Sequence, residues 1–316
     1  MRGMLKTKSP GTQLLIVISI ALVGFFLISI IGTLILAGMS GMSITQLADP
    51  DKWNYNDSKV VFLIRGMQIV QFISLFSIPT FFCAWLFSSN TKEYLGLRAP
   101  FKAAYYPMGI LAMVVALPFV NTIGEINRHV HFPPGLETWL REKEDEASRM
   151  IQALLLRHTV KDLLLNIFCI AGLAAIGEEL LFRGLLQRLF IKIFRNHWVG
   201  IIVAAFLFSA MHLQFFGFLP RFALGILLGL IFWYSGSLWV AMLAHFIYDA
   251  ALIVLAYFYP SMIKDENTVK LANLAFLAVV SLCLIVLVVM WMKKNTGTHY
   301  NRVYADDALP VKDNPF

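Results

Sequence analysis

A charge-free apolar run from Leu14 to Ala37 constrains this chain more than any other feature of the sequence. A run of about 18 or more apolar residues is long enough to span a bilayer as a helix. The apolar core of a cleavable signal peptide is only about 7–15 residues long, and no convincing small-residue cleavage site follows this run. The run is therefore predicted to be a membrane-spanning helix.

Similar apolar runs recur along the chain, and the composition agrees with them. Of the 316 residues, 59% are hydrophobic and 14% are charged, against about 45–50% and about 25% in an ordinary soluble domain. The runs predict an all-α, polytopic transmembrane helical bundle of about eight spans. The spans are expected near residues 14–37, 60–87, 104–122, 160–190, 198–213, 219–235, 238–258 and 272–292.

The charges between the runs predict an orientation. With eight spans, four basic groups fall on one side of the membrane, and acidic stretches such as 142–146 fall on the other. The basic groups are Arg2, Lys6 and Lys8, then Lys92, Arg98 and Lys102, then Arg188, Lys192 and Arg195, and finally Lys293 and Lys294. The positive-inside rule then places both termini in the cytoplasm of a multi-pass protein of the plasma or inner membrane.

The net charge of +7 also agrees with a membrane location. Because the basic residues flank apolar runs, their expected partner is anionic membrane lipid. No basic patch with interleaved aromatic residues is present, so nucleic acid is not an expected partner.

The chain is expected to divide into five parts. Residues 1–122 hold the N-terminal transmembrane helices, 123–159 an extracytoplasmic connection, 160–258 the catalytic core helices, 259–294 the last transmembrane helix and 295–316 a polar cytoplasmic tail. Apolar residues recur at helical spacing within 123–159, with charges between them, which predicts an amphipathic helix. That helix lies either at the membrane interface or in solvent.

Two adjacent carboxylates, Glu178 and Glu179, lie in the middle of the fourth predicted span. A charged side chain at the centre of a bilayer costs at least about 2.5–3.5 kcal/mol, so such residues are usually paired and functional. Arg183 lies four residues after Glu179 on the same helix face and can pair with it. Glu178 is rotated away from this pair and stays available for another partner.

Two further predicted spans supply imidazoles and a third carboxylate. The span near 198–213 carries His212, and the span near 238–258 carries His245 and Asp249 on one face. Carboxylates with imidazoles form the ligand set of zinc or a similar divalent ion, and equally the parts of a general-base site. A lone buried histidine is more often a packing residue, but three spans that each present ionisable groups favour a functional site.

With these residues in place, the chain resembles the CPBP family of CAAX proteases and bacteriocin-processing or immunity (Abi) proteins. The family's three motifs are EExxxR, FxxxH and HxxxN/D. They stand here in family order as Glu178-Glu179-Leu-Leu-Phe-Arg183, Phe208-Ser-Ala-Met-His212 and His245-Phe-Ile-Tyr-Asp249. Each motif is weak alone, but three in order on separate predicted spans are a specific signal. The resemblance covers residues 160–258.

The resemblance implies an endopeptidase buried in the membrane, similar to the type II CAAX prenyl proteases, which remove a short peptide after a prenylated cysteine. By position, Glu178 would activate the attacking water, and His212 would bind that water or a metal. His245 and Asp249 would complete the catalytic set. The expected supporting residues are Glu179, Arg183 and Phe208. The expected substrate is a membrane-anchored or lipidated peptide or protein, cleaved at a CAAX-type end or a leader peptide.

Asp249 departs from the prenyl-protease members, which usually carry asparagine at this position. A carboxylate cannot donate to an oxyanion, but it is a better ligand for a hard or borderline cation. We therefore expect a divalent metal, with zinc as the expected ion, bound by Glu178, His212, His245 and Asp249.

Two alternatives come from other functional classes. A proton-coupled transporter also needs buried Glu, His and Asp, but it predicts paired Gly- or Pro-broken helices in two repeated halves, and no such pairing is present. A non-catalytic immunity or scaffold protein of the same fold predicts loss of a motif residue, and none is lost. Neither the substrate's identity nor the oligomeric state has a signal in the sequence.

Overall fold

The computed structural model describes residues 2–47, 49–260 and 271–297, and within these ranges every regular element is helical. The described residues contain seven helical stretches that are long and apolar enough to cross a membrane. They are Pro10–Ser40, Ser58–Phe87, Tyr105–Arg128, Val160–Phe194, Phe215–Ser235, Leu238–Phe258 and Ala275–Asn295. The chain is thus all-α, and its helices are those of a multi-pass membrane protein.

Several of these stretches consist of more than one element. The first four are α1 (Pro10–Ser40), α3 (Ser58–Gln71) with η2 (Phe72–Ser77) and α4 (Ile78–Phe87), α6 (Tyr105–Val115) with α7 (Leu117–Arg128), and α9 (Val160–Asn166) through η3 (Ile167–Gly172), α10 (Leu173–Glu179) and η4 (Leu180–Gln187) to α11 (Arg188–Phe194). The last three are η5 (Phe215–Gly217) with α13 (Phe218–Ser235), α14 (Leu238–Phe258) and α16 (Leu271–Asn295). The remaining elements are α2 (Ile44–Leu47), η1 (Pro50–Lys52), α5 (Thr91–Tyr94), α8 (Pro134–Leu155) and α12 (His197–Ala210).

The span expected near 198–213 differs from the sequence prediction. The structure has α12 there, an apolar helix of 14 residues that ends at Ala210. At about 1.5 Å per residue this helix is about 21 Å long, shorter than the hydrocarbon core of about 30 Å. Seven stretches therefore qualify by length and composition in the described ranges, and α12 packs against α13 as a shorter apolar helix.

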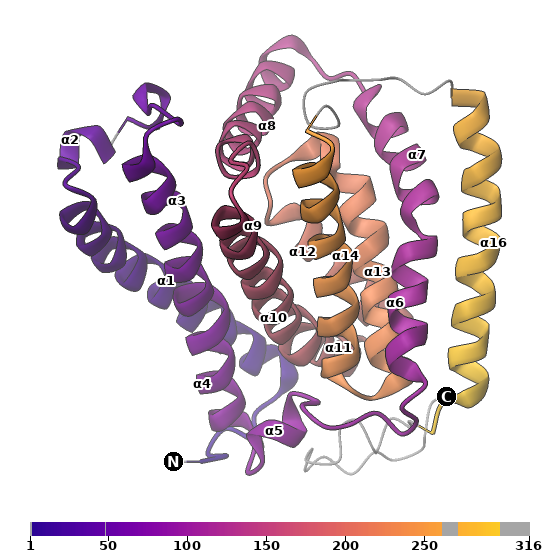
Figure 1. Ribbon diagram of the computed structural model, residues 1–316. Helices are drawn as coiled ribbons and strands as arrows, with labels where there is room; N and C mark the ends of the chain where they lie inside the picture. The colour runs from indigo at the N-terminus through magenta and orange to yellow at the C-terminus, as the bar shows by residue number, and fades with distance from the viewer. Residues whose placement is uncertain (1, 48, 261–270, 298–316) are drawn as a thin grey trace.

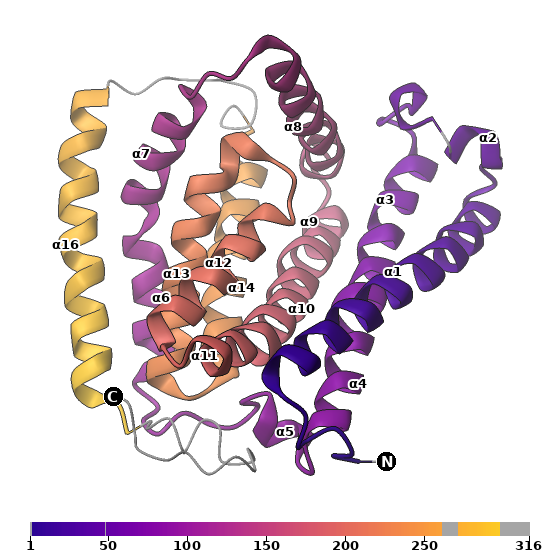
Figure 2. The same cartoon turned by 180° about the vertical axis from the view of Figure 1, so that it is seen from behind.

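The helix that runs from α9 to α11 lies between two groups of helices (Figures 1 and 2). On one side α6, α7, α12, α13 and α14 pack together, and α16 lies outermost against α6 and α7. On the other side α1 packs against α3 and α4. Side chains of α10 can therefore face α12 and α14 within the larger group.

The chain begins and α16 ends at the same end of the bundle (Figure 1). The N–H of Gly3 donates to the carbonyl of Trp85 (2.9 Å), near the end of α4. The ammonium of Lys102 donates to the Asn295 side chain (2.8 Å). The expected tail 295–316 lies outside the described residues beyond 297.

Two stretches of π-helix interrupt the helix from α9 to α11. η3 precedes α10, and η4 follows Glu179 directly. A π-helical turn is wider than an α-helical turn and changes the direction in which later side chains point; such turns are frequent at functional sites. Here they flank the one α-helical segment, α10, that carries Glu178 and Glu179.

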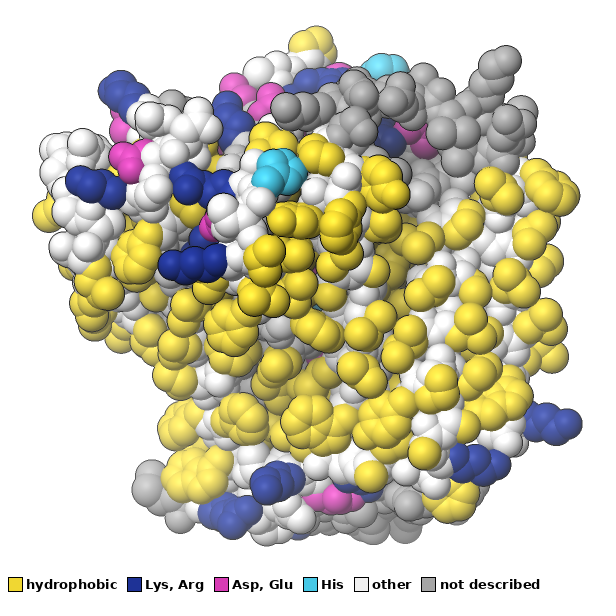
Figure 3. Space-filling model, in the orientation of Figure 1, with side chains coloured by type: hydrophobic (Ala, Val, Ile, Leu, Met, Phe, Trp, Pro, Cys, Tyr) yellow, Lys and Arg dark blue, Asp and Glu magenta, His cyan; other side chains and the backbone are white. Residues whose placement is uncertain are grey.

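The connection 123–159 contains α8, whose Leu140 and Leu154 are buried. Its end is held by the Asn166 side chain, which donates to the carbonyl of Leu154 (2.7 Å). Figure 3 shows hydrophobic side chains over the middle of one face and charged side chains toward its upper and lower edges. The placement of α8 at a membrane interface stays a prediction.

Candidate active site

A cavity of about 540 Å³ lies inside the bundle, and five of the predicted site residues line it. They are Glu178, Phe208, His212, His245 and Asp249. Its walls come from α3 and η2, from η3 and α10, and from α12, α13 and α14. Apolar residues such as Val120, Leu224 and Leu228 contribute to them. The cavity thus combines a mostly apolar wall with a few ionisable groups.

His212 is placed by a turn and not by a helix. α12 ends at Ala210, and Leu213 adopts a positive φ of 53°. This left-handed conformation is uncommon for a residue other than glycine, and it reverses the chain directly after His212. The prediction that the helix continues to residue 213 was therefore wrong, because the chain must turn here to begin α13.

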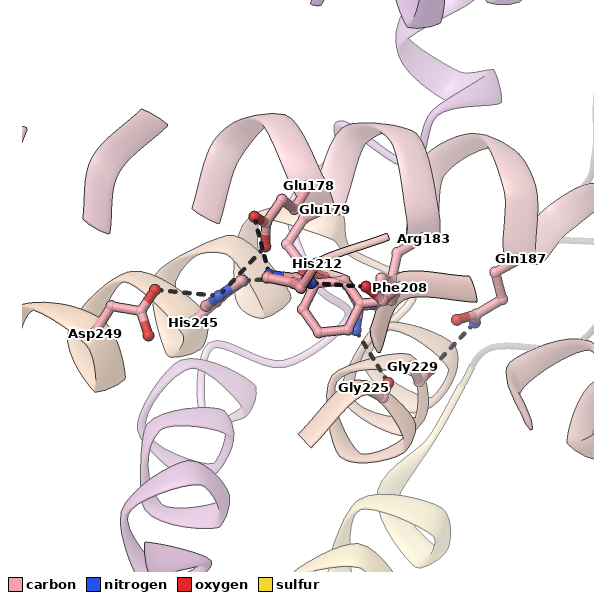
Figure 4. A network of polar contacts seen from close by, with 10 residues as sticks. All are labelled: Glu178, Glu179, Arg183, Gln187, Phe208, His212, Gly225, Gly229, His245 and Asp249. Atoms are coloured by element: carbon pink, nitrogen blue, oxygen red, sulfur yellow. Dashed lines mark hydrogen bonds and ion pairs between the residues drawn. The ribbon is translucent and has the colours of Figure 1, made fainter. Parts of the chain in front are cut away.

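The imidazole of His212 faces Glu178 (Figure 4). Nδ1 donates to the carbonyl of Phe208 (2.9 Å), and since a carbonyl can only accept, this contact places the proton on Nδ1. Nε2 then carries a lone pair and lies 4.0 Å from Oε1 of Glu178. That separation is too long for a direct hydrogen bond and suits a bridging water.

Glu179 connects two elements that the sequence left separate. Its Oε1 accepts from Nη1 of Arg183 (2.7 Å) and lies 3.0 Å from Nδ1 of His245. Glu179 and Arg183 are both fully buried, with side chains 0% and 1% exposed. Arg183 also donates to the carbonyl of Gly225 (3.1 Å) and lies over the ring of Phe208 (4.5 Å). One ion pair thus fixes α10 against α12, α13 and α14.

Both ring nitrogens of His245 face carboxylates. Nδ1 faces Glu179, while Nε2 lies 3.3 Å from Asp249 and 3.9 Å from Glu178. An imidazole donates from both nitrogens only when it is protonated. The arrangement therefore suits a cationic His245 that holds three carboxylates around one ring.

Close helix packing supports this geometry on the side of α13. Gln187 donates to the carbonyl of Gly229 (3.2 Å), one turn beyond the contact of Arg183 with Gly225. A Cβ at Gly229 would lie 2.8 Å from the Gln187 oxygen, and one at Gly225 would lie 3.0 Å from the Cβ of Ala205. Glycine at both positions lets α13 approach η4 and α12 closely enough for these bonds.

The four residues expected to bind a metal are neighbours, but their side chains do not form a ready-made ligand set. Across the described ranges, no group of three or more His, Cys, Asp or Glu side chains is arranged to hold a metal ion. At His245, for example, the two nitrogens already face Glu179 and Asp249. A metal ligand must offer a free lone pair, and this ring offers neither nitrogen freely.

The structure brings all seven predicted site residues into one network (Figure 4). Glu178, Phe208, His212, His245 and Asp249 line the cavity, and Glu179 and Arg183 lie behind it. Their catalytic, supporting and metal-binding roles stay predictions.

Sequence reasoning missed other polar residues that line the cavity, namely Gln68, Gln71, Arg221 and Tyr248. Arg221 had a usable signal, because it is a charged residue within the predicted span 219–235. The two glutamines are three residues apart in the second predicted span, so they share a helix face. Tyr248 had no comparable signal, since tyrosine is common in membrane helices.

Comparison with known proteins finds similarity in the region that carries the site residues. The family described as type II CAAX prenyl endopeptidase Rce1-like matches residues 160–251. A stretch of 89 residues is 37% identical to the uncharacterized protein YpbD of Bacillus subtilis (strain 168). The match covers 27% of this chain and 42% of YpbD, which is less than half of that relative's length. No solved structure matches the chain.

The matched region is also the region that builds the site. Residues 160–251 include α10 with its two glutamates, the turn after α12 with His212, and the part of α14 that carries His245 and Asp249. Residues 160–251 thus form a domain that is similar to the Rce1-like type II CAAX prenyl endopeptidase family.

Proposed function

We propose that this protein is an intramembrane endopeptidase that hydrolyses peptide bonds of membrane-associated substrates with a water activated by Glu178. The observation that supports the proposal best is the convergence of Glu178 and His212 on a cavity inside the helical bundle. Peptide hydrolysis needs an activated water, a stabilised oxyanion and a protonated leaving amine, and the cavity offers groups for each.

The attacking water lies between Glu178 and His212. Both Oε1 of Glu178 and Nε2 of His212 accept hydrogen bonds, and their separation of 4.0 Å lets one water donate to both. Glu178 takes the proton of this water as it attacks the carbonyl carbon of the substrate, and later returns it to the leaving amine. This role needs the carboxylate form of Glu178 at the start of the reaction.

His245 supplies positive charge next to this water. Its Nε2 lies 3.9 Å from Glu178, so a cationic ring beside the attacking water would stabilise the negative charge of the tetrahedral intermediate. Asp249 and Glu179 stabilise the cationic ring, and Arg183 and Phe208 hold Glu179 and the end of α12 in place. No step of this mechanism passes through a metal.

Zinc binding by Glu178, His212, His245 and Asp249 stays a separate prediction. If the side chains rearranged around a divalent ion, that ion would polarise the water and the substrate carbonyl. Metal analysis of the purified protein, before and after chelation, tests this prediction independently of the cleavage assay.

The proposed substrate is a lipidated or membrane-anchored chain end, processed at a CAAX-type terminus or a leader peptide. Two observations support a substrate that arrives within the membrane. The cavity lies among apolar helices, and residues of the α12–α13 turn line it, including Gly217 and Pro220. Both termini are proposed to lie in the cytoplasm, with the protein in the plasma or inner membrane.

The decisive experiment compares wild type with Glu178→Gln and His212→Ala in purified, reconstituted protein. We expect both variants to reach the membrane in normal amounts and to lose cleavage of an S-farnesyl-cysteine peptide by roughly 10²–10⁴-fold, the contribution typical of a general base. Glu142→Gln on the exposed face of α8 is the matched control and should cleave normally.

Full activity of Glu178→Gln would contradict the mechanism. If wild type leaves the prenylated peptide intact, the termini of membrane proteins in cells with wild type and with Glu178→Gln are compared by proteomics. Identical termini in both would favour the non-catalytic scaffold.

A further inference from the structure

Arg221 lies on α13 and lines the same cavity as Glu178 and His212. Its guanidinium contacts only the preceding turn: Nη2 donates to the side-chain oxygen of Gln214 (3.0 Å) and Nη1 to the Gln214 carbonyl (3.5 Å). Within the described ranges of the chain, no carboxylate forms an ion pair with it. Its two hydrogen-bond acceptors are thus neutral, and Glu144 and Glu178 attract the guanidinium only from beyond ion-pair distance.

Two other arginines inside the bundle, Arg183 and Arg65, differ from Arg221 in this respect. Arg183 pairs with Glu179 (2.7 Å), and Arg65 pairs with Asp162 (2.9 Å). A charge away from water is costly unless it is paired. The guanidinium of Arg221 therefore has donors and charge with which to bind an anionic ligand in this cavity.

The turn between α12 and α13 fixes where this guanidinium lies. A Cβ at Gly217 would be 2.2 Å from Nη2 of Arg221, so the guanidinium lies directly against the Gly217 backbone. Gln214, which holds the guanidinium, is itself held because its amide donates to Glu144 of α8 (3.3 Å). His212 lies two residues before Gln214, so one turn positions both His212 and Arg221.

The chemistry of the cavity points to a carboxylate as the ligand. A planar guanidinium matches a carboxylate through two parallel hydrogen bonds. Glu178 and Asp249 line the same cavity and would repel an anionic substrate, so such a substrate needs a compensating positive charge. Arg221 supplies that charge on a different helix from either carboxylate.

We propose that Arg221 binds a carboxylate of the peptide substrate and so makes the protein selective for peptides that carry one beside the scissile bond. The proposal rests on the proposed endopeptidase function. The carboxylate is either the C-terminal carboxylate of the chain or the side chain of an acidic residue near that end.

Binding measured without cleavage tests this proposal. Three fluorescent S-farnesyl-cysteine peptides are titrated into reconstituted Glu178→Gln protein: one with a free C-terminal carboxylate, its C-terminal amide, and the amide with glutamate as last residue. We expect the free-carboxylate peptide to bind roughly 10- to 100-fold more tightly than the amide, the factor that one charge-assisted hydrogen-bonded pair supplies. Tight binding of the third peptide would assign the selectivity to acidic side chains as well.

The double variant Glu178→Gln with Arg221→Gln should bind all three peptides equally, at the level of the amide. Arg221→Lys should restore part of the preference, because it keeps the charge without the planar pair of donors. Arg128→Gln, at the exposed end of α7, is the matched arginine control and should leave the preference unchanged.

Equal loss of affinity for all three peptides in the Arg221→Gln background would show a merely structural role and overturn the proposal. An undiminished preference for the free-carboxylate peptide over its amide would overturn it as well. Because binding is read in a background that lacks Glu178, the outcome does not depend on whether the wild type cleaves these peptides. In a wild type that does cleave, Arg221→Gln should raise KM for the free-carboxylate peptide and leave kcat nearly unchanged.

Discussion

His245 is the central residue of the candidate site, because its ring nitrogens lie 3.0, 3.3 and 3.9 Å from Glu179, Asp249 and Glu178. Any chemistry assigned to this site has to account for that charge distribution. A protonated ring can donate to these carboxylates from both nitrogens. A ring that binds a metal would need Nε2 to turn from Asp249 to the ion.

Asp249→Asn separates these possibilities at the residue scale. We expect cleavage to fall about tenfold, because an amide stabilises a cationic His245 less than a carboxylate does, a difference of about 1.4 kcal/mol. The rate is measured together with the metal content of the same preparation. A fall in metal content in step with activity would support a ligand role for Asp249. Unchanged activity, or an increase in metal content, would count against that role.

At the scale of elements, α8 links the segment 123–159 to the candidate site through hydrogen bonds. Glu144 on α8 accepts from Gln214, which in turn holds Arg221. Burial raises the pKa of Glu144 above its usual range, against the opposing attraction of Arg221, and its Oε2 has no hydrogen-bond partner among the described residues. Folding therefore favours the neutral form of this carboxyl group more than the unfolded state does.

This shift predicts a pH-dependent stability for α8. A raised pKa in the folded state gives a contribution that is complete below the ordinary carboxyl pKa and is lost as the pH rises through the raised pKa. Glu144→Gln, which stays neutral, should therefore raise Tm relative to wild type at pH 7, with the difference vanishing toward pH 4. We expect only a degree or two, about 0.5 kcal/mol, because solvent screens a half-buried group.

Thermal unfolding of the reconstituted protein at several pH values measures this difference. Glu142→Gln, exposed on the same helix, serves as the control and should follow wild type at every pH. A Glu144→Gln protein that is less stable than wild type at neutral pH would show that attraction to Arg221 outweighs burial.

At the scale of the whole molecule, the chain begins and α16 ends at one end of the bundle, with a hydrophobic belt between two charged edges (Figure 3). Arg188, which the sequence placed among the flanking charges, is buried and donates to the carbonyl of Tyr94 (2.8 Å). The remaining basic residues at this end still favour a cytoplasmic location.

Fusion of a fluorescent protein that folds only in the cytoplasm tests the orientation. We expect full fluorescence from fusions to either terminus of the intact protein, and little from an insertion into the exposed part of α8 near Glu142. Fluorescence from only one terminus would mean an odd number of crossings, and would exclude α12 as the short eighth span.

The sequence by itself determined seven segments that are long and apolar enough to cross the membrane, and which residues are chemically unusual there. Both are local properties. A span is recognised by the length of its apolar run, and Glu178 by the free-energy cost of a charged side chain within such a run. The motif residues could therefore be predicted to lie together, and Figure 4 shows that they do. The same reasoning extended α12 by one turn, because apolar character does not reveal where the chain must reverse.

Only the tertiary structure decided how these residues share their charges. The sequence pairs Glu179 with Arg183 four residues away, but Glu179 also contacts His245, 66 residues away, and Arg183 contacts Gly225, 42 residues away. The tertiary structure also places Arg221 in the cavity, where no carboxylate of the described ranges forms an ion pair with it. Such partners depend on how closely α10, α13 and α14 pack and on the wider turn of η4, which no local pattern specifies.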